Sequence, residues 1–214
     1  MNGVAAGGGW TVGLLAGAYL AWRWRHPLVA IGLVLAAAVS GGLIPVLAAG
    51  GGAAGGPLAA GAPVPAAYRP WVERAGSFCP QISPALIAAQ LSQESGFNPN
   101  ARGSSGEQGI AQFMPRTWPS WATDANHNGP PSPLDPPDAI EAQGHFMCHL
   151  AGAASAGVST GRLHGNVTAL ALAGYNAGFG AVQAAGGLPA IPSTRAYVTH
   201  ITNLADRYAD PSRL

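Results

Sequence analysis

The sequence predicts a mainly α-helical domain that is preceded by one or two membrane-spanning helices. Three observations support this fold class. None of the nine acidic residues lies in the first 72 positions, and that part of the chain contains long uncharged apolar runs. The remainder carries repeated helix start and stop signals. No stretch of the remainder shows the sustained alternation of β-branched residues that is typical of strands.

Two uncharged runs occupy residues 4–22 and 27–49. A spanning helix needs about 20 apolar residues, which the second run supplies, whereas the first run is richer in glycine. The short segment between the runs contains two arginines, and tryptophans lie in it or next to it. This pattern is typical of a cytoplasmic loop at the membrane surface. We therefore predict a membrane anchor over residues 1–49, in which either both runs or only the second cross the cell membrane.

Both arrangements place the rest of the chain on the extracellular side of the membrane. A buried core helix is the alternative interpretation of residues 27–49, but its Gly-Gly pair and Pro45 would weaken a helix in water. Residues 50–67 consist mainly of glycine, alanine and proline, so they cannot bury enough apolar surface to fold alone. They predict a flexible linker that leads into a globular domain over residues 68–214.

The first helix of this domain is predicted over residues 84–95. Ser83 is a favourable N-cap, Pro84 suits the first helical position, and Gly96 is a typical stop signal. Three further helices are predicted from signals of the same kind. They are the segment from Asp135 or Asp138 to about Ala154, the segment from Asn166 or Thr168 to Gly178, and residues 193–209.

The chain has two cysteines, Cys79 and Cys148, and both lie in the predicted domain. An even number of cysteines in an extracellular domain indicates a disulfide. Such a bridge would close a loop of about 70 residues and contribute roughly 4 kcal/mol or less in the chain-entropy description. Two unrelated buried thiols are the alternative interpretation.

Glu94 lies where a charged carboxylate is disfavoured. On the helical period it shares the apolar face with Ile87, Gln90 and Leu91, and it falls in the last turn, at the negative end of the helix dipole. Burial and the dipole both raise the pKa of a carboxyl group, which makes Glu94 a candidate general acid. A solvent-facing glutamate at a frayed helix end is the alternative.

Polar and aromatic side chains flanked by glycine follow Glu94 in the sequence. Glycine lets the backbone approach a ligand closely, and sugar-binding sites combine aromatic faces with amide groups. These segments therefore favour a carbohydrate site. These segments contain Gln112, Tyr175 and Asn176, and a later segment adds Tyr197.

Taken in order, the segments ESGFNPNA, GxxGxAQFMPRTW, YNAG and TRAYV resemble the successive motifs of the transglycosylase SLT family, which comprises lytic transglycosylases that cleave peptidoglycan. The resemblance covers roughly residues 78–205. It implies a lysozyme-like fold of the goose-type or SLT kind, with Glu94 as the catalytic acid and base. It also implies that substrate is contacted by Gln112, Met114, Tyr175, Asn176 and Tyr197. The FCP and FMC segments resemble those that carry paired cysteines in actinobacterial members.

Two positions depart from the family pattern. Members often carry serine where this chain has Gly103, and they usually carry glutamate where it has Ser193. The second motif also offers Glu107, a carboxylate at a position that the family does not use for catalysis. The resemblance therefore implies a mechanism with one carboxyl group and no required cofactor.

The resemblance implies that the substrate is the glycan strand of peptidoglycan and that the product is a 1,6-anhydro sugar. A hydrolytic muramidase of the same fold is the nearest alternative. A wall-binding module with little turnover, serving a conjugation or secretion apparatus, is another. The net charge of +1 excludes the basic surface that a nucleic-acid partner would need.

The segment DANHNGPPSPLD fits the spacing of a calcium-binding loop, D-x-N-x-N-G-x5-D. Its oxygen ligands would be Asp124, Asn126, Asn128, Ser132 and Asp135. The loop has only two acids, and three prolines stiffen it. A polar, proline-rich surface loop is the alternative interpretation, and both remain open at this point.

Overall fold

A computed structural model describes residues 55–210 and 212. Regular structure in this part of the chain is helical, with three isolated β-bridges. The elements are α1 (Arg69–Ala75), α2 (Pro84–Ser95), the 3-10 helix η1 (Trp118–Ser120), α3 (Pro136–Ser159), α4 (Val167–Ala177), α5 (Phe179–Ala185) and α6 (Pro192–Ala209). The predicted membrane anchor, residues 1–49, lies outside the described residues and stays a prediction. None of the described helices is both long and apolar enough to cross a bilayer.

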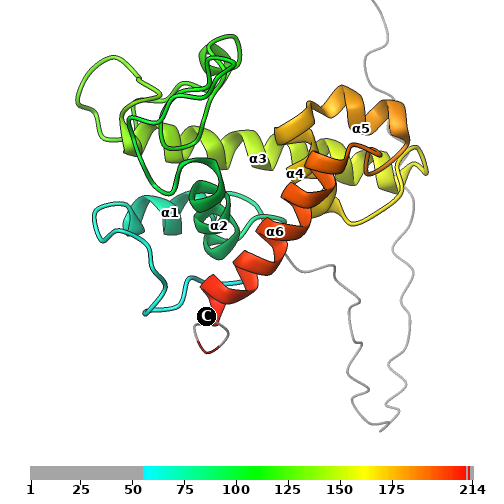
Figure 1. The fold of residues 1–214 in the computed structure, drawn as a ribbon, viewed down its shortest axis with the longest axis horizontal. Coiled ribbons are helices and arrows are strands. Elements are labelled where there is room, and N and C mark those ends of the chain that lie inside the picture. Colours follow the sequence, from blue (N-terminus) through cyan, green and yellow to red (C-terminus); the bar gives the residue numbers. More distant parts are fainter. Residues whose placement is uncertain (1–54, 211, 213–214) are drawn as a thin grey trace, which may run out of the picture. The chain divides into compact units, whose positions relative to one another are not determined.

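Helix α2 lies in the centre of the domain, as Figure 1 shows, and packs against α1, α3 and α6. Its start and stop signals act as predicted. The Ser83 hydroxyl accepts a hydrogen bond from the Leu86 amide at 3.1 Å, and Gly96 ends the helix in the left-handed conformation at φ 61°. The side chains of Ile87 and Leu91 are fully buried. Glu94, on the same face, is thereby fixed in the last turn at the edge of the core.

Helix α3 begins with Asp135 at its N-cap and ends at Ser159, not near Ala154 as predicted. The extra turn is stabilised from outside the helix. The Thr160 hydroxyl donates to the Ala156 carbonyl at 2.8 Å, and Leu163 packs so closely on Gly157 that a Cβ there would lie 2.5 Å from the leucine. The stop signal at this end is Gly161, which follows the C-cap residue Thr160 in the left-handed conformation at φ 68° and which the prediction did not use.

Helix α4 packs against α3, α5 and α6. Of the two predicted caps, Asn166 accepts a hydrogen bond from the Ala169 amide at 3.0 Å. The Thr168 hydroxyl instead donates to the Gln81 carbonyl, at 3.3 Å.

The predicted disulfide is confirmed, because Cys79 and Cys148 are bonded and join the segment before α2 to α3.

Residues 55–67, predicted as part of a flexible linker, lie against the helices. The Gly56 carbonyl accepts a hydrogen bond from the Ala85 amide of α2 at 3.2 Å, and the side chains of Ala62 and Val64 are buried. The segment has no hydrophobic core of its own, but its buried side chains belong to the core that the helices form. The folded domain therefore begins earlier than predicted; the rest of the predicted linker lies outside the described residues.

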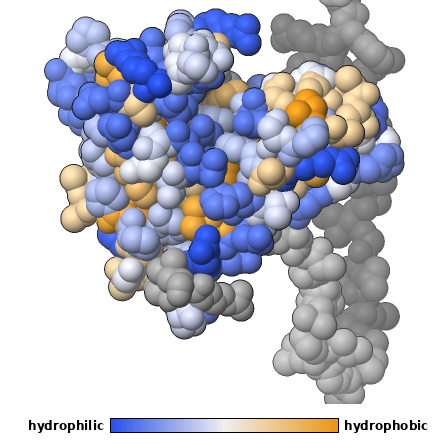
Figure 2. All heavy atoms as spheres, viewed as in Figure 1, coloured by the Kyte–Doolittle hydropathy of each residue, from blue (hydrophilic) through white to orange (hydrophobic). Residues whose placement is uncertain are grey.

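The surface of the domain is largely polar in the view of Figure 2. Within residues 55–210, Ile191 is the only large hydrophobic side chain that is classed as exposed, with 38% of its area accessible. The large apolar side chains of the described residues therefore pack mainly into one core, around α2, α3, α4 and α6.

Candidate active site

Glu94 opens onto a cleft of about 310 Å³ that brings together segments distant in the sequence. One wall comes from the loop between α2 and η1, and another from the end of α4. The lining residues are Glu94, Ser105, Glu107, Gln112, Met114, Arg116, Tyr175 and Asn176. Four of the five predicted substrate-contacting residues therefore share the cleft with Glu94. The fifth, Tyr197, lies behind Glu94 and is only 8% exposed.

The end of α2 is tied to the loop that forms the cleft wall. The Ser95 hydroxyl donates to the carbonyl of Ile110 at 2.7 Å. Because Gly96 turns the chain immediately afterwards, the loop returns beside the last helical turn. The position of the Glu94 carboxyl group relative to the cleft is thus set by a helix terminus and by the part-buried hydrogen bond of the Ser95 side chain to the loop backbone.

A hydrogen-bonded chain connects Glu94 to the core. The amide nitrogen Nε2 of Gln90 donates to the hydroxyl oxygen of Tyr197 at 3.1 Å, and the Tyr197 hydroxyl donates to Glu94 Oε1 at 2.5 Å. A phenol has a single proton, and Gln90 already donates to its oxygen, so the Tyr197 proton is directed at the carboxylate. Gln90 is fully buried and stands one helical turn before Glu94.

The environment of Glu94 shifts its protonation into the neutral range. The pKa of Glu94 is raised from 4.5 to about 7 as the net result of three causes: burial, the largest, raises it, the hydrogen bond from Tyr197 lowers it, and the charge of Glu107 raises it. Burial also raises the pKa of Tyr175 and of Tyr197 well above the usual value for a phenol. Both tyrosines therefore keep their protons, while Glu94 can give up and regain one near neutral pH.

The loop that carries Gln112 is held in an uncommon conformation. Gln112 has a positive φ of 53°, which is rare outside glycine. Its side-chain amide donates to the carbonyl of Gly109 at 2.7 Å and to that of Ala101 at 3.3 Å. The Tyr175 hydroxyl donates to the carbonyl of Ala111 at 2.8 Å, which links α4 to the same loop. Backbone strain of this kind is concentrated at binding and catalytic sites.

Asn176 is oriented by the start of α6. Its side-chain oxygen accepts a hydrogen bond from the Thr194 hydroxyl at 2.9 Å, which leaves the two amide protons available on the cleft. Ser193, where the family usually has glutamate, is exposed. The Asn176 amide at this end of the cleft is therefore oriented by Thr194 and not by residue 193.

A model of the transglycosylase SLT domain matches residues 74–197, more than half of the chain. The chain belongs to this family. Among solved structures, the 70 kDa soluble lytic transglycosylase SLT70 from Escherichia coli is 24% identical, with a TM-score of 0.50 over 69% of this chain and 25% of that chain. An inactive mutant of lytic transglycosylase Slt from Pseudomonas aeruginosa is 19% identical, with a TM-score of 0.47 over 68% of this chain and 24% of that chain.

The family match and the likeness to SLT70 confirm the family assignment and the lysozyme-like SLT fold of the described domain. The chain spans about a quarter of the length of the two solved structures.

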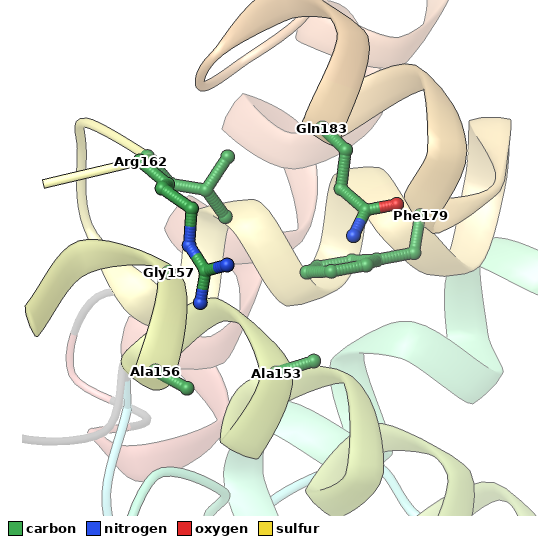
Figure 3. Close-up of a pocket in the computed structure, with 7 residues that line it drawn as sticks. Ala153, Ala156, Gly157, Arg162, Phe179 and Gln183 are labelled. Carbon is green, nitrogen blue, oxygen red and sulfur yellow. The ribbon is translucent and has the colours of Figure 1, made fainter. Parts of the chain in front are cut away.

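Outside the cleft, the SLT domain contains a second cavity of about 250 Å³ between α3 and α5, into which Figure 3 shows Arg162, Phe179 and Gln183 pointing. Its other lining residues are Ala153, Ala156, Gly157 and Leu163, so it offers no acid for glycosidic cleavage.

The sequence interpretation gave no role to Gln90, which is buried behind Glu94, or to Glu107, which lines the cleft. Gln90 was identifiable as an amide on an apolar helical face, four positions before the candidate acid. Glu107 had been set aside because the family pattern does not use its position. The structure places its carboxylate on the cleft, close enough for its charge to affect the pKa of Glu94.

Proposed function

We propose that this domain is a lytic transglycosylase that cleaves the β-1,4 glycosidic bond between N-acetylmuramic acid and N-acetylglucosamine in peptidoglycan. The observation that carries the proposal is a partly buried carboxyl group, Glu94, whose pKa is raised to about 7 at the edge of a cleft. Membership of the SLT family supports the same reaction class. Glycan strands lie outside the cell membrane, which agrees with the predicted location of the domain.

In the proposed reaction, Glu94 first donates its proton to the glycosidic oxygen, and the bond from that oxygen to C1 of the muramic acid breaks. The resulting carboxylate then accepts the proton of the C6 hydroxyl group of the same sugar. The C6 oxygen bonds to C1 and gives the 1,6-anhydro product. One group can perform both steps because its pKa lies near the working pH.

The products distinguish this reaction from hydrolysis by the same fold. We expect digestion of purified glycan strands to release muramic acid ends that are lighter by one water than the reducing ends from a muramidase. Mass spectrometry of the products measures the difference directly. Reducing ends alone would replace the proposal with a hydrolytic mechanism, which normally requires a second carboxylate. Retention of glycan strands without any release would instead favour a binding module.

The loop over residues 124–135 supports a separate proposal of a structural calcium ion. The side-chain oxygen Oδ1 of Asn126 is buried and has no hydrogen-bond partner among the described residues, as expected of an unused ligand. The amide nitrogens of Asn126 and Asn128 both donate to the carboxylate of Asp135. Rotation of these two amides would present oxygen atoms in their place. The Ser132 hydroxyl accepts instead from Leu134, at 3.2 Å.

The described residues contain no group of three or more histidine, cysteine or acidic residues that could hold a metal. Because the loop offers only two acidic ligands, we place its calcium affinity in the range of about 0.1–1 mM that is typical of extracellular modules. We expect isothermal titration to detect binding in that range for the native chain and to lose it in Asp135→Ala. The absence of heat at millimolar calcium would show that the segment is a surface loop.

A further inference from the structure

Gly103 and Glu107 occupy the same space in the wall of the cleft. A Cβ atom built on Gly103 would lie 2.1 Å from Oε2, 2.7 Å from Cδ and 2.9 Å from Cβ of Glu107. Non-bonded carbon atoms normally stay about 3.5–4.0 Å apart. The clash includes the Cβ of Glu107, so rotation of the carboxylate alone would not relieve it. The Glu107 side chain therefore fills the place that a side chain at position 103 would take.

The turn over residues 103–107 holds this carboxylate in place. The Gly103 amide donates to the Glu107 carbonyl at 3.0 Å, and the Gly106 amide donates to the Gly103 carbonyl at 3.2 Å. The Ser105 amide donates to Glu107 Oε2, also at 3.0 Å. The other oxygen, Oε1, has no protein partner in the described part of the chain. Arg116 lines the same cleft, but no ion pair joins it to Glu107.

We propose that Glu107 is a substrate-binding residue whose carboxylate accepts a hydrogen bond from a hydroxyl or acetamido N–H group of the sugar bound beside Glu94. Gly103 is its steric complement, because only a residue without a side chain leaves the space. A carboxylate only accepts hydrogen bonds, and a glycan strand presents many neutral donors. This inference rests on the proposed function, since it places a glycan in the cleft.

Glu107 also acts on the acid across the cleft. Its negative charge disfavours a second charge on Glu94 and raises the pKa of Glu94. The other titratable groups that face Glu94 or share its cleft are Tyr197 from α6 and Tyr175 from α4, both of which keep their protons, and Arg116 from the loop before η1. Removal of the charge on Glu107 therefore has a second expected effect, a lower pKa for Glu94, which a purely structural role would not produce.

The direct test is Glu107→Gln in the 214-residue chain, with Glu73→Gln as the matched control. Glu73 has 52% of its side chain exposed and lies in α1. We expect Glu107→Gln to raise KM for uncrosslinked glycan strands about tenfold, the effect of losing one hydrogen bond to a charged group, and to change kcat little. The basic limb of the kcat/KM profile should move to lower pH. An unchanged KM would overturn the proposal.

Binding without turnover separates this inference from the proposed reaction. In the Glu94→Gln background, we expect the additional Glu107→Gln change to weaken equilibrium binding of glycan strands about tenfold. If the native chain proves to lack lytic activity, this measurement still decides the role of Glu107. Equal affinity of the single and double variants would overturn the inference even if lysis is observed.

The steric relation is tested by a double-mutant cycle. Gly103→Ser should weaken glycan binding and lower the melting temperature in the native background, because its Cβ would displace Glu107. In the Glu107→Ala background the two closest clashing atoms, Oε2 and Cδ, are absent and only the Cβ contact at 2.9 Å remains, so the same change should cost clearly less and should return a polar group to the site. Equal losses in both backgrounds would show that the two positions are independent.

Discussion

Replacement of Glu94 by glutamine is expected to abolish the release of anhydro sugars from peptidoglycan while the domain remains folded. Glutamine keeps the size of the side chain and can still accept the hydrogen bond from Tyr197, but it has no acidic proton to transfer to the glycosidic oxygen. Removal of a general acid costs about 10²–10⁴ in rate, and here the same group also acts as the base. Product release by Glu94→Gln, measured against native chain at pH 7, should fall by at least about a thousandfold.

The same substitution should make the domain more stable at neutral pH. The pKa of Glu94 rises from 4.5 to about 7 on folding, so between these pH values the folded state binds a proton that the unfolded state has lost. Stability of the native chain therefore falls as pH rises from 4.5 through 7, by at most about 3 kcal/mol. Glutamine does not titrate, and this loss should be absent from the variant.

Urea denaturation at pH 5 and pH 8 measures the difference in the free energy of unfolding. We expect Glu94→Gln to match the native chain closely at pH 5 and to exceed its stability at pH 8. Glu73→Gln, at an exposed site, should follow the native chain at both pH values.

The activity of the same variant decides the role of Glu94 in the reaction. Residual anhydro-sugar release by Glu94→Gln at more than a few per cent of the native rate would show that another residue donates the proton.

The sequence was most informative where the signal is local. The limits of α2 follow from Ser83, Pro84 and Gly96, which act on their immediate neighbours, and the position of Glu94 within the last turn follows from those limits. The structure supplies a partner that no local pattern contains. Tyr197 comes from a helix 103 positions later, and its role as a donor to Glu94 depends on the crossing of α2 and α6.

Other features escaped prediction because they depend on tertiary contacts. Helices α1 and α5 have only seven residues each, too few for a clear periodic pattern, and are stabilised by packing on α3 and α4. Residues 55–67 have no core-forming composition but bury side chains against a core made by others. The relation between Gly103 and Glu107 is likewise invisible to motif comparison, which treats each position separately.

Replacement of Tyr197 by phenylalanine is expected to move the pH dependence of lysis in the opposite direction from Glu107→Gln. The hydrogen bond from the Tyr197 hydroxyl stabilises the carboxylate form and lowers the pKa of Glu94, so its removal should raise that pKa above about 7. Activity that requires protonated Glu94 should then persist to higher pH. The maximal rate should fall by about 10–100-fold, because the hydrogen bond also stabilises the carboxylate formed during the reaction.

The phenylalanine should also reduce stability, since it leaves the buried Nε2 of Gln90 without its acceptor, at a cost of about 1–3 kcal/mol. Tyr208→Phe is the matched control, because Tyr208 is a buried tyrosine of the same helix that does not bond to Glu94. Profiles of kcat/KM from pH 5 to 9 for both variants give the comparison. A basic limb of Tyr197→Phe that stays in place or moves to lower pH would mean that Tyr197 orients Glu94 without setting its proton affinity.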